Sequence, residues 1–291
     1  ASGALASGDT VVVNADGTVS VIAGASASQA LGSAAVFQGA SINGTNVAAT
    51  YDANAQKVVI AYKTGAKGTA VVGTVSGTSI SFGTPAVFEN ANVEYVSITY
   101  DANAQKVVVV YSDAGESAVG TAAVGTVSGT NISFGTPVVF NGAASYYNAI
   151  TYDAVAQKVV IAYRDAGNGN DGTAIVGTVS GTSISFGSEA VFETGTTTHI
   201  SIVYDTNAQK VVIAYMDDSN GNKGTAVVAT VSGTSISFGT LVIYEQGETL
   251  GVSVTYDANA QKVVIAYVDQ TNSFKGTAIV GTVSGTNISF G

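Results

Sequence analysis

The side chains best suited to ligand chemistry are a few aromatic and charged residues outside the repeated positions of the chain. Ten of the 14 tyrosines occupy repeated positions, whereas Tyr95, Tyr146 and Tyr147 do not. His199 is the only histidine and Arg164 the only arginine. Exposed aromatic rings stack on sugar rings and anchor interfaces, so these residues predict a ligand-recognition surface.

Other candidates share the variable positions of these residues. Asn46 stands five residues before a repeated tyrosine, as Tyr95 does. Met216, like Arg164, begins the segment that follows a second predicted strand, and Phe274 is the only phenylalanine outside the repeated frame. The complete predicted ligand-binding set is Tyr95, Tyr146, Tyr147, His199, Arg164, Met216, Asn46 and Phe274.

Catalytic signatures are weak in this sequence. A lone histidine defines no Ser-His-Asp set, and a glycosidase needs two carboxylates about 5–10 Å apart. The predicted inner strands, such as "VSITY" and "VSVTY", carry no acid before their final aspartate, and Glu94, Glu193 and Glu248 form no obvious pair. The sequence therefore predicts a protein that is not an enzyme.

Two acidic loops raise the question of a metal. The segments "DAGNGNDG" (Asp165–Gly172) and "DDSNGNKG" (Asp217–Gly224) are rich in the oxygen ligands that calcium prefers. The matching loop "KTGAKG" in the first unit has no acid, and Gly, Asn and Asp are also ordinary turn residues. We predict no cofactor and no metal site, with calcium left as an open alternative.

Composition excludes several classes of partner. The formal net charge is -10 and only 10% of the 291 residues are charged, which argues against a nucleic-acid binder. There is no cysteine and hence no thiolate chemistry. No apolar run approaches the roughly 20 residues of a membrane span, so no membrane insertion is expected.

A repeat sets the architecture that positions the candidates. The phrase "YDANAQKVV" begins at Tyr51 and returns at Tyr100 and Tyr256, and with one change each at Tyr152 and Tyr204. In the third unit, short β-branched and aromatic runs read as four strands: "NAITYD", "KVVIAY", "GTAIVGTVSG" and "SISFGSEAVF". Four antiparallel strands in about 50 residues are typical of one propeller blade. The prediction is an all-β, five-bladed β-propeller of four-stranded antiparallel blades.

The N-terminal segment is predicted to close the ring. "LGSAAVF" (residues 31–37) matches the frame of "FGTPAVF" (residues 82–88), whereas the last unit stops at "NISFG". The start of the chain thus supplies a half-strand that the end lacks, leaving no open sheet edge. Residues 1–291 form a single domain in this prediction, with a hairpin at 9–22, the closing strand and lead-in at 31–50, and five repeats of about 52 residues at 51–291.

The variable segments are expected to share one face of the disc. The turns between strands 1 and 2 and between strands 3 and 4 hardly change between units. The segments between strands 2 and 3 and from strand 4 to the next strand 1 change in length and composition, and strand alternation places both sets at the other end. A constant scaffold with one diversified face is typical of a binding surface. The alternative is neutral drift in exposed loops.

The wording of the units, "GTAIVGTVSGTSISFG" and "YDANAQKVVIAY" after the lead-in "GDTVVVNADGTVSVI", resembles repeat β-propellers of lectins and of tail-fibre-like or surface proteins from marine phages and bacteria. The five-unit ring resembles the five-bladed tachylectin type. The resemblance covers nearly the whole chain, although the tryptophan-rich sugar pockets common in such lectins are missing, since the chain has no Trp. It implies an extracellular or virion-surface recognition module.

Together these observations predict a non-catalytic module that binds a glycan or a cell-surface receptor through the face with the variable segments. The alternative is a structural component of a virion or cell surface, such as a phage tail fibre or adhesin, that contacts other virion or surface proteins.

Overall fold

The computed structural model describes residues 11–13, 19–21, 32–42 and 46–291, and nearly all of its regular structure is β-strand. The only helix in these ranges is the short 3-10 helix η1 (Asp218–Asn220). No helix in the described ranges has the length and apolar character needed to cross a membrane. The all-β prediction is confirmed.

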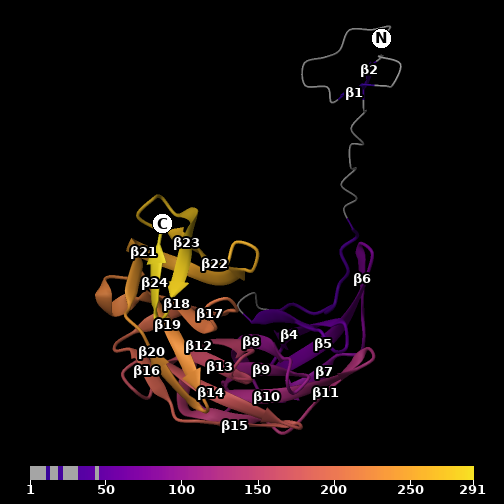
Figure 1. Ribbon diagram of the computed structural model, residues 1–291. Helices are drawn as coiled ribbons and strands as arrows, with labels where there is room; N and C mark the ends of the chain where they lie inside the picture. Colours follow the sequence, from indigo (N-terminus) through magenta and orange to yellow (C-terminus); the bar gives the residue numbers. More distant parts are fainter. Residues whose placement is uncertain (1–10, 14–18, 22–31, 43–45) are drawn as a thin grey trace.

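The strands fall into five units that follow one another around an arc, in a β-propeller-like arrangement (Figure 1). The first strands are β3 (Val47–Asp52), β8 (Val93–Asp101), the later part of β12 (Val138–Asp153), β17 (Thr197–Asp205) and the later part of β21 (Val242–Asp257). The second strands are β4 (Lys57–Thr64), β9 (Lys106–Asp113), β13 (Lys158–Asp165), β18 (Lys210–Asp217) and β22 (Lys262–Asp269). The third strands are β5 (Lys67–Ser76), β10 (Val119–Ser128), β14 (Asp171–Ser180), β19 (Lys223–Ser232) and β23 (Lys275–Ser284).

In the first four units the fourth strand consists of two pieces that pair with the same third strand, whereas the fifth unit has only the first piece among the described residues. The first pieces are β6 (Ser79–Phe82), β11 (Asn131–Phe134), β15 (Ser183–Phe186), β20 (Ser235–Phe238) and β24 (Asn287–Phe290). The second pieces are β7 (Ala86–Glu89), the early part of β12, β16 (Ala190–Glu193) and the early part of β21. Strands β12 and β21 run without a break from one unit into the next, so two segments expected as loops, residues 141–147 and 245–251, are extended strand.

The repeated phrase is explained by the turn between strands 1 and 2. Asp52 Oδ1 accepts a hydrogen bond from the backbone N–H of Ala55 at 2.8 Å, and the aspartates of the other four units do the same. Gln56 adopts φ 55°. The Tyr100 hydroxyl of the next unit lies 3.2 Å from the Asn54 N–H and accepts from it. The aspartate of the phrase therefore caps its own turn, and the tyrosine also connects neighbouring units.

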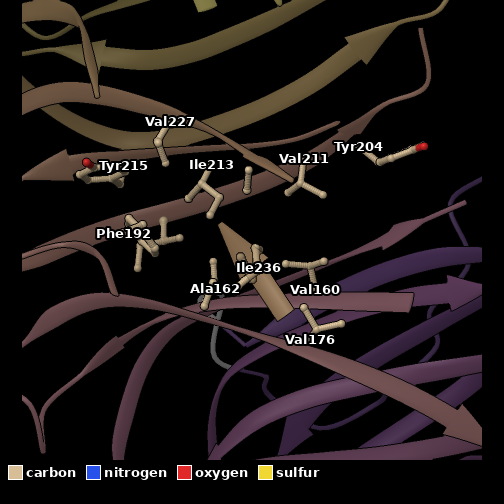
Figure 2. Close-up of a cluster of buried hydrophobic side chains, with 14 residues drawn as sticks. Val160, Ala162, Val176, Phe192, Tyr204, Val211, Ile213, Tyr215, Val227 and Ile236 are labelled. Carbon is tan, nitrogen blue, oxygen red and sulfur yellow. The ribbon is translucent and has the colours of Figure 1, made fainter. Parts of the chain in front are cut away.

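The hydrophobic core lies between successive sheets. Figure 2 shows the cluster between the third and fourth units, where Val160, Ala162 and Val176 face Val211, Ile213 and Val227. The alternation of the strands presents one set of apolar side chains to the preceding unit and the other to the following unit. Stability therefore depends on each unit having a neighbour on both sides.

An aromatic ring from the outer strand of one unit packs across each interface between neighbouring units. Phe192 packs against Tyr215 of the next unit, with ring centroids 5.2 Å apart, and against Phe238 at 5.8 Å. The same ring lies on the backbone of Gly172, where an added Cβ would come within 2.5 Å of it. The "GT" that opens each third strand thus leaves space for an aromatic ring.

The two ends of the array differ from its middle. Within the predicted N-terminal hairpin, β1 (Val11–Val13) and β2 (Val19–Val21) pair antiparallel, and the rest of residues 9–22 lies outside the described residues. Strand β23 pairs with β22 and β24, and no second piece of a fourth strand pairs with it in the described chain. No strand pairing among these residues joins the last unit to the first.

Candidate functional site

The two sets of variable segments meet at one end of every unit. At the start of each segment between strands 2 and 3, a backbone N–H donates a hydrogen bond to a backbone carbonyl of the segment that leads into strand 1. Ala166 N donates to Ala144 O at 3.0 Å, and Ala114 N donates to Asn92 O at 2.8 Å. The first, fourth and fifth units repeat this contact through Lys63 and Asn46, Asp218 and Thr196, and Gln270 and Glu248. The variable segments are therefore held together, away from the aspartate-capped turns.

A β-bulge interrupts the first strand at this end of units two to five. The pairing register shifts between Glu94 and Ser97, and again at the equivalent places in β12, β17 and β21. The bulged residues Tyr95, Tyr147 and His199 have φ of 51°, 53° and 51°, and the fourth is Gly251. A side chain in this left-handed region costs about 1–3 kcal/mol. Three units therefore have a residue with an aromatic ring or an imidazole at a strained backbone position.

These bulges bring side chains from three units into contact. Tyr95 lies 5.0 Å from Tyr147 and 5.6 Å from Tyr146 between ring centroids, and Tyr147 lies 5.5 Å from His199. Arg164 places its guanidinium carbon 4.8 Å from the centroid of the Tyr146 ring and 5.1 Å from that of Tyr147. We call these five residues the aromatic cluster. All of them are partly exposed.

A network of buried polar side chains holds the backbone on both sides of Tyr146 and Tyr147. The Ser145 hydroxyl donates to Asn148 Oδ1 at 2.6 Å, and Asn148 Nδ2 donates to the Ser112 hydroxyl at 3.0 Å. The Ser112 hydroxyl in turn donates to the Ser145 carbonyl. Ser145 and Asn148 flank Tyr146 and Tyr147, so the network fixes the bulge. Sequence reasoning missed these residues, although Asn148 stands where the other units carry Val or Ile.

The charged groups around the cluster are engaged with protein partners, with Arg164 as the exception. Lys63 Nζ lies 3.9 Å from Glu94 Oε1. Asp218 accepts a hydrogen bond from the Thr198 hydroxyl at 2.7 Å. Burial raises the pKa of the Tyr95 hydroxyl, the neighbouring Tyr147 raises it further, and Arg164 partly offsets this. The cluster is thus a surface of neutral rings with one uncompensated cation.

Burial lowers the pKa of His199 below 6.5, although Asp218 opposes this shift. Burial therefore favours the neutral imidazole, and the cluster presents it as a fourth flat ring. Protonation of His199 is expected to weaken the folded state, because the unfolded chain binds the proton more readily.

A pH titration of stability tests this assignment. The stabilising contribution is complete above pH 6.5 and is lost as the pH falls through and below that value. Denaturant unfolding of the wild type and of His199→Gln at pH 7.5 and pH 5 should therefore show a larger loss in the wild type, since the carboxylates are common to both. Parallel losses would contradict the lowered pKa.

The other three predicted site residues do not join the cluster. Met216 is buried in β18 opposite Thr198 and offers no surface, because the strand continues one residue beyond the predicted loop start. Asn46 is buried, and its carbonyl accepts from Lys63 N at 3.0 Å. Phe274 is exposed on the turn between β22 and β23, with φ 59°, and no ring contact joins it to the cluster in the described chain.

The carboxylates of the two acidic loops accept hydrogen bonds from their own turns and from neighbouring segments. Asp165 Oδ1 accepts from Gly167 N at 2.9 Å and from Asn141 Nδ2 at 3.0 Å. Asp217 Oδ1 accepts from Asn220 N at 3.0 Å, and Asp171 Oδ1 accepts from Gly195 N at 2.6 Å. Within the described ranges, no three acidic or histidine side chains gather as metal ligands. The prediction of no metal site, with calcium as its alternative, stays untested.

Known proteins of similar structure share the fold at low identity. No family model and no curated protein matches the sequence. A protein from Lactobacillus plantarum is 12% identical with a TM-score of 0.63, over 96% of this chain and 75% of that one. The BP39L lectin from Burkholderia pseudomallei is 14% identical with a TM-score of 0.60, over 97% of this chain and 79% of that one. These likenesses support the β-propeller-like, lectin-like architecture. They do not single out the tachylectin or phage type.

A third likeness corrects the prediction that the chain is not an enzyme. A putative exo-β-1,3-galactanase from Bifidobacterium bifidum is 10% identical with a TM-score of 0.51, over 84% of this chain and 90% of that one. Enzymes therefore occur within this architecture. The prediction was wrong to exclude catalysis. It relied on the lack of a recognisable carboxylate pair in this sequence, and that lack does not exclude enzymes from the fold.

Proposed function

We propose that the chain binds a glycan through the aromatic cluster. The observation that carries the proposal is the set of strained bulges: three successive units hold Tyr95, Tyr147 and His199 in left-handed backbone, where their rings meet. Glycine would relieve the strain, as Gly251 does in the fifth unit. Rings kept at such a cost, on one edge of contiguous units, suit stacking on the apolar faces of sugars.

The finer architecture belongs to the same proposal: a five-bladed ring closed by residues 32–38. Phe37 packs against Tyr62 and Phe82, with centroids 5.1 and 5.8 Å apart, as Phe88 packs against Tyr111 and Phe134. Gly276 has no atom within 4 Å of a Cβ built on it, whereas the equivalent Gly172 carries a ring. Pairing of residues 35–38 with β23 would supply that ring. A closed ring would arrange the bulges around a central axis.

The proposed location is extracellular or on a virion surface. It rests on the resemblance of the repeats and on the places where glycans are displayed. A lectin among the solved structures of this fold supports the ligand class.

Replacing Tyr147 with glycine should separate binding from folding. Loss of a stacked ring is expected to weaken glycan binding by about 1–3 kcal/mol, or roughly 5- to 150-fold. Stability should change little, because relief of the left-handed backbone offsets part of the lost packing. A panel of neutral and acidic oligosaccharides, followed by calorimetry on any that bind, measures the first effect, and thermal unfolding measures the second.

The matched control is Phe274→Gly, which makes the same change at an exposed aromatic residue of φ 59° outside the cluster. Its glycan binding should equal that of the wild type. Failure of the wild type to bind any oligosaccharide, or equal binding by Tyr147→Gly, would refute the proposed function.

A further inference from the structure

Arg164 is a cation without an anionic partner. The only ion pair in the described part of the chain joins Lys63 and Glu94. The Arg164 Nε atom is buried and has no hydrogen-bond partner among the described residues. Buried unsatisfied donors are rare in folded proteins and call for an explanation. Both features are unexpected in a chain with twice as many acids as bases, 20 against 10.

The repeat itself provides a comparison. Lys63 occupies in the first unit the position that Arg164 occupies in the third, and its partner Glu94 precedes the bulged residue of the next unit. The residue equivalent to Glu94 in the unit that follows Arg164 is Thr198, whose hydroxyl already donates to Asp218. The site that gives Lys63 a carboxylate therefore gives Arg164 a neutral side chain.

The surroundings of Arg164 suit a ligand carboxylate. Tyr146 and Tyr147 hold the guanidinium against their rings, which limits its rotamers and removes water from its faces. The planar fork of N–H groups matches the two oxygens of a carboxylate. Glu94 is neutralised by Lys63, and the net charge of the whole chain is screened beyond about 8 Å at physiological ionic strength. A contact with the guanidinium is direct and escapes that screening.

The geometry points to an acidic sugar as the ligand, with its carboxylate bound by Arg164 and its ring stacked in the aromatic cluster. This inference rests on the proposed glycan binding and narrows it to carboxylated pyranoses. Hexuronates and sialic-acid-type sugars share this chemistry, and the experiment below tells them apart.

The test compares each acidic probe with its neutral counterpart. Calorimetry would use oligogalacturonate against its methyl ester, and sialyllactose against its methyl ester. For at least one pair, the wild type should bind the acid roughly tenfold tighter or more, as expected of a charge-assisted contact. Arg164→Gln should abolish this preference and keep the affinity for the neutral probe, whereas Arg164→Lys should retain part of it. The pair that shows the preference identifies the source of the carboxylate.

Lys63→Gln is the matched control, because it removes the cation of the equivalent position, which already has a protein partner. Its preference for the acid should equal that of the wild type, and thermal unfolding should show that all three variants are folded. Equal affinity for acid and ester in the wild type, or a preference that survives in Arg164→Gln, would overturn the inference and leave glycan binding intact. Binding of none of the four probes would overturn the inference, and the proposed glycan binding would fall as well only if the wild type also bound no member of the wider oligosaccharide panel.

Discussion

Replacing Phe192 with alanine is expected to lower the free energy of unfolding by about 3–5 kcal/mol. The ring is buried and contacts Tyr215, Phe238 and the backbone of Gly172, so its removal leaves a cavity shared by two units. The glycine cannot fill that space. Denaturant unfolding followed by circular dichroism measures the change.

The control for this prediction is Val155→Ala, in the turn between β12 and β13. Val155 is 62% exposed, and its backbone N–H bonds to Asp153 whatever its side chain. Its effect should stay within about 0.5 kcal/mol. A loss below about 1 kcal/mol for Phe192→Ala would mean that the interfaces between units contribute little to stability.

The scaffold could be predicted from the sequence because the same unit recurs five times along the chain. Each copy of the phrase at Tyr51 carries an aspartate at the start of a turn, and the structure uses each one as a side-chain cap. The frame match between residues 31–37 and 82–88 agrees with the structure, in which the Phe37 ring packs against Tyr62 as the Phe88 ring packs against Tyr111. A local interaction that recurs at fixed spacing can be predicted without knowledge of contacts between distant parts of the chain.

The site could be predicted only in part. Five of the eight predicted residues form the aromatic cluster. Three of them, Tyr95, Tyr147 and His199, stand five residues before a repeated tyrosine, and that constant spacing carries information about position. The left-handed backbone at Tyr147 could not be foreseen, since a bulge depends on how β12 pairs with β13. Met216 failed for a related reason: the last residues of a strand look like a loop in sequence, and burial there depends on the neighbouring strand.

The net charge of the chain, -10, does not describe the charge at the aromatic cluster. The structure shows that the acids near the cluster are engaged, Glu94 with Lys63 and Asp218 with Thr198, whereas Arg164 is not. Net charge describes the field at a distance, and recognition depends on the groups that lack partners at contact range.

Phe37→Ala should destabilise the chain as much as Phe192→Ala does, by about 3–5 kcal/mol, if the ring is closed. In a closed ring Phe37 would contact Tyr62 and Phe82 on one side and the bare backbone of Gly276 on the other, as Phe192 contacts both of its units. In an open arc it would lose only the first set. The two variants thus form a matched pair whose difference reports closure.

Closure should also appear in the apolar surfaces at the two ends. Ala266 and Val280 of the last unit are exposed, whereas their counterparts Ala214 and Val228 are fully buried against the next sheet. At the other end, Tyr51 is 55% exposed and its counterpart Tyr204 only 8%. Each exposed set has the composition that its counterparts bury in the middle of the array, so the two ends are complementary.

Hydrogen exchange along residues 276–278 should be slow in the full chain and fast after deletion of residues 1–38, because only the closing strand can pair there. Fast exchange in both, together with a loss below about 1 kcal/mol for Phe37→Ala, would rule out closure. Slow exchange that appears only at high protein concentration, with a larger species on gel filtration, would instead mean that the strand is donated by a second copy of the chain.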